Sequence, residues 1–322
     1  MSRYVLRRLL LSVPVFILAT VIVFALVSFR GDPLAHLRQQ PGVAPETIAA
    51  LEREFHLNDS GIQRYWDWLS DFVRGDWGTS YATRRPVAEM IGAALPNTLI
   101  LVGGAVIISV TLAMAVGVVC AVRHRSAVDH ALSGLSYVGL SMPTFWLGLL
   151  LQLLLVIVPY NAYGIRLVYA TGMHSTGNEG QLVDLLRHLV LPVLTLSMLH
   201  VAAWSRFQRA GMLDALSTDY VRTARAKGVP EGIVIFRHAL RNALLPFVTV
   251  TALGLAAMVG GSIVTERVFA WPGMGTLFVA ALSGDDHPVI LACLGVSAVA
   301  MILANLAADL AYGALSPRTA ER

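Results

Sequence analysis

The sequence predicts an all-α integral membrane protein with six transmembrane helices, both termini in the cytoplasm, and a helical extracytoplasmic loop between the first two spans. Three observations lead to this fold class. The 322 residues are 56% hydrophobic and 14% charged, whereas soluble domains are about 45–50% apolar and 25% charged. Six long apolar segments divide the chain, and most of its basic residues fall on one side of them.

Each apolar segment is about long enough to cross a bilayer. About 20 helical residues, rising 1.5 Å each, span roughly 30 Å of hydrocarbon. The first segment follows Arg3, Arg7 and Arg8 as a secretory signal would. It exceeds the usual apolar core of a signal and no A-x-A site follows it, so we expect an uncleaved first span. The predicted spans are 9–29, 98–122, 131–158, 188–204, 244–264 and 289–312.

The distribution of basic residues sets the expected orientation, because short cytoplasmic loops carry an excess of Lys and Arg. With the N-terminus inside, the short outer loops hold little more than Arg166, together with Arg187 and Arg267 at span ends. We therefore expect both termini in the cytoplasm. The cytoplasmic segments then hold Arg3, Arg7, Arg8, Arg123, Arg125, Arg206, Arg209, Arg222, Arg225, Lys227, Arg237, Arg241, Arg318 and Arg322.

The expected organisation has three parts: 1–30, the cytoplasmic N-terminus and first span; 31–96, an extracytoplasmic helical loop; and 97–322, a five-helix core containing a cytoplasmic loop at 206–242. Within the outer loop, "PETIAALEREFHL" (45–57) and "IQRYWDWLSDFV" (62–73) space their apolar residues as amphipathic helices do. In the second helix we expect Tyr65, Leu69 and Phe72 to share one face. This loop suits either a cap over the membrane domain or a docking surface for a soluble partner.

The run "DYVRTARAKG" (219–228) predicts a short helix in the cytoplasmic loop, stopped by Gly228 and Pro230. So short a helix is marginal alone in water, so it needs a surface to pack against. A second helix is expected at 231–242, with Ile233, Phe236 and Leu240 on one face, making a helical hairpin. The small side chains Thr223, Ala224 and Ala226 would let the first helix enter a groove on another protein. The alternative is a loop that is basic only because inner loops are basic.

The segment "RTARAKG" resembles the signature loop of ABC importer permeases, where an E-A-A-x-x-x-G pattern forms the coupling helix that sits in a cleft of the ATPase subunit. Arg222 stands in place of the Glu and Thr223 in place of the first Ala, while Ala224 and Gly228 match. A Leu-Pro pair, 245–246, lies further from the glycine than in the general pattern. The resemblance implies an ATPase coupling surface made by Tyr220, Arg222, Thr223, Ala224, Arg225, Lys227 and Gly228.

More of the chain resembles the dipeptide, oligopeptide and nickel importer permeases. The quoted helix followed by "RHALRNALLP" has their form, as do "GDP" (31–33), "GDWGTS" (75–80), "RRPV" (84–87), "LPNTL" (95–99), "LSMPTFWLG" (140–148) and "DDHPV" (285–289). One span followed by a long outer loop is similar to their B-type subunit, with the fold of a type I permease. The segment "TERVFAWPGMGTLFVAAL" (265–282) resembles their outer-face motif, here Glu266, Phe269, Trp271, Pro272, Gly273 and Gly275.

This resemblance implies a non-catalytic subunit of an ATP-driven peptide importer in the bacterial cytoplasmic (inner) membrane, forming half of the translocation pathway. No G-x-x-x-x-G-K-[ST] loop occurs in the sequence, so ATP and Mg are expected on partner subunits and no cofactor in this chain. The expected partners are membrane lipid, a second homologous permease, two ATPase subunits or one fused ATPase, and an extracytoplasmic substrate-binding protein.

Other readings remain open at this point. The same machinery would serve nickel chelates or glutathione as cargo. A self-sufficient secondary transporter would show inverted repeats and paired intramembrane acids, and an intramembrane enzyme would need a nucleophile with a base or a metal site. The histidines show no H-E-x-x-H pair, so no metal is expected, and no nucleic acid either, since the net charge of +4 lies beside apolar spans. Polar residues predicted at membrane depth are Gln152, His200, Asn305 and Asp309; Pro143, Pro192 and Pro246 interrupt or begin spans.

Overall fold

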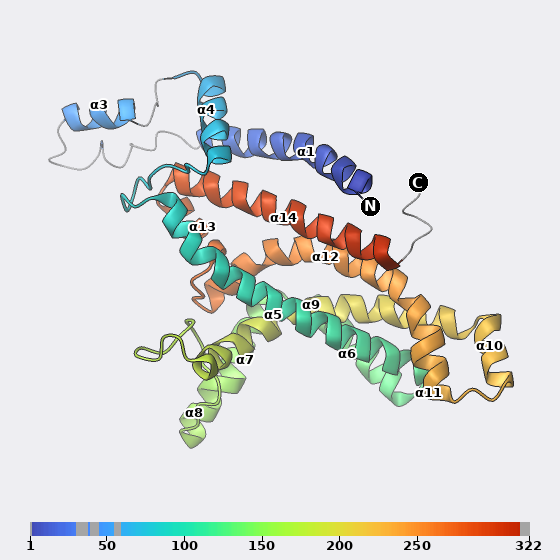
Figure 1. Ribbon diagram of the computed structural model, residues 1–322. Helices are drawn as coiled ribbons and strands as arrows, with labels where there is room; N and C mark the ends of the chain where they lie inside the picture. Colours follow the sequence, from blue (N-terminus) through green and yellow to red (C-terminus); the bar gives the residue numbers. More distant parts are fainter. Residues whose placement is uncertain (1, 30–37, 39–44, 55–58, 316–322) are drawn as a thin grey trace. The chain divides into compact units, whose positions relative to one another are not determined.

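The computed structural model describes the whole chain except residues 1, 30–37, 39–44, 55–58 and 316–322, and it is built of helices (Figure 1). The described residues contain no β-strand, only one isolated bridge between Thr79 and Pro86. The elements are α1 (Ser2–Phe29), α3 (Pro45–Glu54), α4 (Gly61–Arg74), α5 (Val87–Val122), α6 (Ala127–Ser141), α7 (Thr144–Gln152), the π-helix η1 (Leu153–Ile157), α8 (Val158–Tyr163), α9 (Leu182–Leu216), α10 (Asp219–Ala226), α11 (Glu231–Ile233), the π-helix η2 (Val234–Ala239), α12 (Leu240–Val268), α13 (Met274–Ser283) and α14 (His287–Leu315).

The all-α membrane fold is confirmed. Six helical segments of the described chain are long and apolar enough to cross a membrane: Leu10–Phe29, Val87–Val122, Thr144–Tyr163, Leu182–Leu216, Glu231–Leu255 and His287–Ala307. The chain forms two compact units. Unit 1 contains Met1–Val5, Asn97–Pro272 and Leu303–Arg322, and unit 2 contains Leu6–Pro96 and Gly273–Ile302. The expected orientation of the termini and the three-part division of the chain stay predictions.

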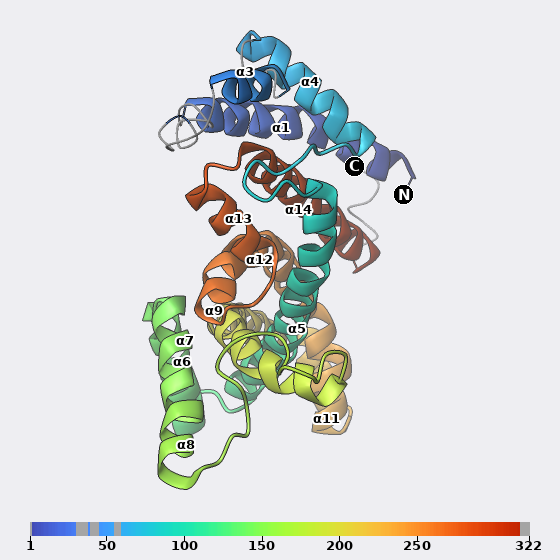
Figure 2. The same ribbon diagram turned by 90° about the vertical axis from the view of Figure 1, so that its left-hand side faces the viewer.

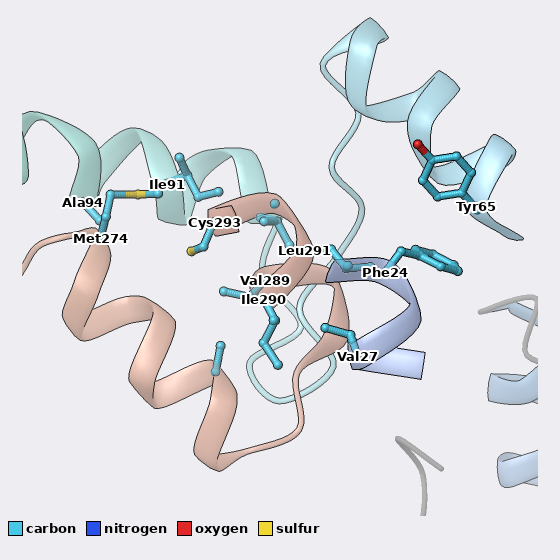
Figure 3. Close-up of a cluster of buried hydrophobic side chains, with 13 residues drawn as sticks. Phe24, Val27, Tyr65, Ile91, Ala94, Met274, Val289, Ile290, Leu291 and Cys293 are labelled. Atoms are coloured by element: carbon cyan, nitrogen blue, oxygen red, sulfur yellow. The ribbon is translucent and has the colours of Figure 1, made fainter. Parts of the chain in front are cut away.

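Unit 2 is built around α4, which lies against α1 (Figure 2). The Tyr65 hydroxyl lies 3.1 Å from that of Thr20, and the Tyr65 ring meets Phe24 edge to face at 5.5 Å. Figure 3 shows Phe24 close to Leu291 at the start of α14; the rings of Phe24 and Tyr65 both belong to a buried cluster that also contains Ile91 and Ala94 of α5. The expected face of α4 is confirmed: Tyr65 is buried, and Leu69 and Phe72 are half-buried. The other predicted outer helix is α3, but its expected last residues, 55–57, lie outside the described residues.

Unit 1 is centred on α9 and α12, which cross closely because glycine stands where a side chain would collide. A Cβ atom at Gly254 would lie 2.6 Å from the Trp204 ring, and one at Gly117 of α5 would lie 2.6 Å from Gln208. Small residues of this kind let membrane helices approach. The 35 residues of α9 rise about 50 Å. This length exceeds the hydrocarbon thickness, so α9 extends beyond the bilayer at one or both ends.

Several predicted span boundaries were wrong. The segment 131–158 is not one helix: α6 ends at Ser141, and Met142 is extended at ψ 127° before Pro143. Proline disfavours helical backbone in the residue before it, so a new helix starts at Thr144. The predicted spans 98–122, 188–204 and 244–264 are parts of longer helices, because hydropathy marks the apolar length of a helix and not its polar ends. Pro192 and Pro246 lie inside α9 and α12.

Candidate functional site: a helical hairpin between α9 and α12

The short helix α10 forms where the run "DYVRTARAKG" predicts it and ends as expected at Gly228. This residue has φ +75°, a left-handed conformation that glycine adopts without strain. The Gly228 N–H donates to the Arg225 carbonyl at 3.0 Å, and the Val229 N–H donates to the Ala224 carbonyl at 3.2 Å. These two bonds make a Schellman motif, which satisfies the last carbonyls of the helix and turns the chain sharply.

One face of α10 is buried against the chain itself. Val221 is fully buried and Ala224 is 8% exposed, both in a cluster with Met212 of α9 and Val234 of η2. The expectation that Ala224 belongs to a groove-facing surface was therefore wrong. Its small side chain instead allows α10 to pack closely on its own supporting helices. In this way the rest of the chain supplies the support that so short a helix lacks alone.

The second arm of the hairpin differs from the separate helix expected at 231–242. It runs without a break from α11 through η2 into α12. The π-helix pairs each residue with one five positions away and so rotates the side chains relative to an α-helix. Val234 and Ala239 are buried, whereas Ile233 and Phe236, expected on the packing face, are 45% and 65% exposed. The predicted face was therefore wrong at these two positions, whereas its third member, Leu240, is half-buried against the same cluster.

Two polar contacts fasten α10 to the second arm. The Arg225 guanidinium donates two hydrogen bonds to the Glu231 carboxylate, at 3.1 and 2.6 Å. The Asn242 amide donates to the Tyr220 hydroxyl at 2.6 Å. Glu231 and Asn242 were absent from the predicted site. With the buried face, these contacts hold α10 at each end.

The outer face of α10 is cationic and contains small side chains. Arg222 lies 3.3 Å from Asp219 in an exposed ion pair of the kind that contributes little to stability. Ala226, with its short side chain, is exposed on this face. Of the predicted coupling residues, all except Ala224 are exposed: Tyr220, Arg222, Thr223, Arg225, Lys227 and Gly228. The charge of this surface is complementary to that of an acidic groove. The described residues contain no group of three or more side chains that could hold a metal ion.

An ion pair joins the beginning of α6 to the part of α9 that precedes the hairpin in the sequence. The Arg209 guanidinium donates to both carboxylate oxygens of Asp129 at 2.8 Å. The backbone N–H of Arg125 donates a third bond to the same carboxylate. The hydrogen bond from Arg209, followed by that from Arg125, holds the pKa of the buried Asp129 well below its usual range. Asp129 was not among the predicted site residues, since its partner lies 80 positions away.

The predicted outer-face motif folds back on the segment "LPNTL". The Trp271 indole N–H donates to the Asn97 carbonyl at 2.9 Å, and the Asn97 amide donates to the Pro272 carbonyl at 2.8 Å. Thr98 donates to the Glu266 carboxyl at 2.7 Å. Glu266, Phe269 and Trp271 are buried and Pro272 is exposed, while Gly273 and Gly275 are buried at the start of α13.

Several of the remaining predicted residues make hydrogen bonds within their own units. In unit 2, the buried Asp286 of "DDHPV" accepts bonds from the Ser80 hydroxyl at 2.5 Å and the Tyr81 N–H at 3.0 Å, which closes the loop after "GDWGTS". Gln152 donates to the Ala170 and Val268 carbonyls. His200 bonds the Leu196 carbonyl and meets the edge of Trp204, while Asn305 is exposed. The Asp309 side chain lies outside the described residues.

Comparisons with known proteins agree with this architecture. The family model described as binding-protein-dependent transport system inner membrane component matches residues 113–321, and the model of its N-terminal part matches residues 1–102. The chain is 37% identical to an oligopeptide transport system permease protein of Bacillus subtilis, covering 99% of each. It is 36% identical to a glutathione transport system permease protein of Escherichia coli, covering 98% of each.

A solved structure shows the same fold. The chain resembles a structure of the MetNI methionine ABC transporter in an inward-facing conformation, with a TM-score of 0.57 and 16% identity over 72% of this chain and 98% of the other.

Proposed function

Because this chain belongs to the family of inner membrane components of binding-protein-dependent transport systems, we propose that it couples peptide import to ATP hydrolysis through α10. As a member of the family it is a multi-pass protein of the bacterial inner membrane, a non-catalytic permease that works with ATPase and substrate-binding components. The family's description names a binding-protein-dependent system, which a self-sufficient secondary transporter is not.

The observation that carries the coupling role is that α10 has two faces with different tasks. Its inner face is fixed to α9 and to η2 by Val221 and Ala224, and the Tyr220–Asn242 bond adds a polar fastening. Its outer face presents cations and the small Ala226. If a groove on a partner protein holds the outer face of α10 and then moves, the attached ends of α9 and α12 therefore move with it. Rigid-body motions of this kind switch membrane domains between conformations.

The assembly we propose has this chain as one of two homologous permeases, each forming half of the pathway. Two ATPase subunits, or one fused ATPase, would bind ATP and Mg and receive α10 of this chain in a cleft. An extracytoplasmic binding protein would deliver the cargo. The proposal is supported by the exposed cationic face of α10 and by the absence of any phosphate-binding G-x-x-x-x-G-K-[ST] loop from the sequence.

Peptides are the cargo that we propose, by analogy with the oligopeptide relative. The glutathione relative favours a second candidate, glutathione itself, at almost the same identity. Competition separates the two: in vesicles containing the whole transporter, excess glutathione would suppress uptake of a labelled tripeptide only if both share the pathway. Nickel chelates form a third arm of the same assay.

The coupling role is tested by co-purifying the ATPase with the tagged permease complex. Ala226→Glu adds a carboxylate to the exposed outer face without entering the buried cluster, and we expect it to lower ATPase recovery at least tenfold. The control is Arg123→Gln, which changes an exposed residue before α6 and should leave recovery unchanged. Ala224→Glu is a poor test, because a buried carboxylate would disrupt the hairpin itself. Equal recovery with Ala226→Glu and wild type would refute docking on this face.

A further inference from the structure

Unit 2 contains a cavity of about 760 Å³ that the coupling role does not use. It lies between α4, the end of α1, the loop after α4 and the start of α14. Its volume falls within the roughly 300–1,000 Å³ of small-molecule sites. The predicted topology places this part of the chain on the extracytoplasmic side, where cargo arrives.

The inner wall of the cavity is apolar and aromatic. Phe24 and Val27 of α1 contribute to it together with Leu291 of α14, and Figure 3 shows the three close to one another. Trp68 and Trp77 complete the wall. Both indoles are half-buried, so each keeps an accessible surface. Such a wall would accept the apolar body of a ligand.

Charged residues of both signs on α4 form a rim of the cavity beside Trp68. Arg64, Asp67, Asp71 and Arg74 follow one another at intervals of three, four and three residues and all line the cavity, so they share one face of α4. Among the described residues, Arg64 and Asp67 form no ion pair, and Asp71 reaches Arg74 only at 3.8 Å. The rim therefore offers a guanidinium and carboxylates that are not committed to strong partners.

The spacing of these charges defines the ligand. Arg64 and Asp71 are seven residues apart on the helix, which separates them by about 10 Å along its axis. An extended tripeptide is also about 10 Å long, at roughly 3.3–3.6 Å per residue. A carboxylate at one end would meet the guanidinium of Arg64, and an ammonium at the other end would meet Asp71.

We propose that this cavity binds a short zwitterionic peptide of about three residues, with its C-terminal carboxylate at Arg64, its N-terminal ammonium at Asp71 and its side chains against Trp68 and Trp77. The proposal rests on the peptide cargo proposed above. It makes the cavity a binding site for that cargo on the permease itself. The alternative occupant is a surface of the binding protein. We favour the peptide because the charges of both signs line a concave site with an aromatic wall.

The test measures binding to the assembled transporter in lipid nanodiscs, without ATP and without the binding protein. Three probes are titrated by calorimetry: trialanine, its N-acetylated form and its C-terminal amide. Wild type is compared with Arg64→Gln and Asp71→Asn. The matched controls are Arg85→Gln and Glu89→Gln, an exposed ion pair of the same unit that does not line the cavity.

Each substitution is expected to weaken binding only of those probes that carry the charged group which the substituted residue contacts; we call this the crossed pattern. Arg64→Gln should weaken trialanine binding at least tenfold but leave binding of the amide unchanged, since the amide has no carboxylate to lose. Asp71→Asn should weaken trialanine binding similarly but leave the acetylated form unchanged. The controls should bind all three probes as wild type does. A general distortion of unit 2 would weaken every probe equally and would overturn the proposal, as would a wild type that binds none of them.

A measurement of trialanine uptake by the complete transporter distinguishes two outcomes: that the cavity does not bind peptides, and that peptides are not the cargo. If the complete transporter imports trialanine but the crossed binding pattern is absent, the cavity is not a peptide site, while the peptide function stands. If the crossed pattern is present but neither trialanine nor longer peptides are imported, the cavity proposal holds and the cargo assignment fails. If the variants lose recruitment of the binding protein but keep all three affinities, the rim is a protein-docking surface and the peptide proposal is refuted.

Discussion

The Tyr220 hydroxyl accepts a hydrogen bond of 2.6 Å from the Asn242 side-chain amide, which joins the start of α10 to the start of α12. Asn242 lies 22 positions after Tyr220, and the turn of the hairpin lies between them. The bond therefore closes the hairpin at the end opposite to the Schellman turn. A force applied to α10 reaches α12 through this bond as well as through the buried face.

Tyr220→Phe should loosen this coupling without unfolding the hairpin. A lost hydrogen bond costs about 1 kcal/mol, so the closed hairpin should be disfavoured roughly fivefold. We expect more ATP to be hydrolysed for each peptide imported, with ATPase recovery nearly unchanged. The measurement is the ratio of ATP hydrolysis to uptake in vesicles. Tyr163→Phe, at an exposed tyrosine in the same unit, is the control, and an unchanged ratio in Tyr220→Phe would contradict the role of the bond.

Gly228 gives a prediction that depends on backbone conformation alone. At φ +75° its Cβ position is empty within 4 Å, so any effect of a substitution comes from backbone strain and not from a clash. Gly228→Val should destabilise the hairpin by about 1–2 kcal/mol or more, whereas Gly228→Asn should be milder because Asn tolerates this region. Limited proteolysis of the complex measures this difference: Gly228→Val should be cleaved in the hairpin faster than Gly228→Asn, and Gly228→Asn faster than wild type.

The control for Gly228 is Gly232→Ala. Gly232 lies in α11 with an equally empty Cβ position but no positive φ. Alanine is favoured over glycine inside helices by up to about 1 kcal/mol, so this variant should be as resistant to protease as wild type or more so. Equal protease sensitivity in Gly228→Val and Gly232→Ala would show that the left-handed turn is not what ends α10.

The hairpin shows which features of the site the sequence could predict. A glycine followed two positions later by Pro230 stops a helix by local chemistry, so the end of α10 was predictable. The orientation of Ala224 was not, because it depends on residues such as Met212 and Val234 that become neighbours only in the fold. Nor was η2, since nothing in "VIFRHA" distinguishes a π-helix from an α-helix. The predicted face of the second arm failed at Ile233 and Phe236 for that reason.

The same contrast holds in the rest of the chain. The apolar faces of α4 follow from residue spacing and were correct at Tyr65. The pairs that fasten distant segments, Asp129 with Arg209 and Thr98 with Glu266, lie 80 and 168 positions apart. The family resemblance drew attention to Glu266, but it gave no partner. A single sequence contains no signal for contacts of this range.

Thr98→Val should destabilise unit 1 by removing one hydrogen bond from the buried Glu266 carboxyl. The loss expected is about 1–3 kcal/mol, because a buried polar group is left with one partner fewer. Thr98→Ser keeps the hydroxyl and should behave as wild type. Thermal unfolding of the complex in detergent measures both. Equal melting temperatures for Thr98→Val and Thr98→Ser would show that the hydroxyl adds nothing to the packing of the outer-face motif.

The Asp129–Arg209 pair predicts how stability depends on pH. Its hydrogen bonds favour the ionised carboxylate, so the pKa of Asp129 is lower in the folded protein than its unfolded value of about 3.9. A group shifted in this direction contributes stability above the unfolded pKa and loses it as the pH falls through the folded pKa. Asp129→Asn should therefore unfold at a lower temperature than wild type. We expect this difference in unfolding temperature to stay constant between about pH 7 and pH 5 and to narrow only under strongly acidic conditions.

The control is Asp219→Asn, which removes an exposed ion pair with Arg222. Its unfolding temperature should differ little from that of wild type at any pH, because solvent screens that pair. A difference for Asp129→Asn that vanished already between pH 7 and pH 5 would mean that the carboxylate is protonated there, and that the ion pair with Arg209 does not lower its pKa.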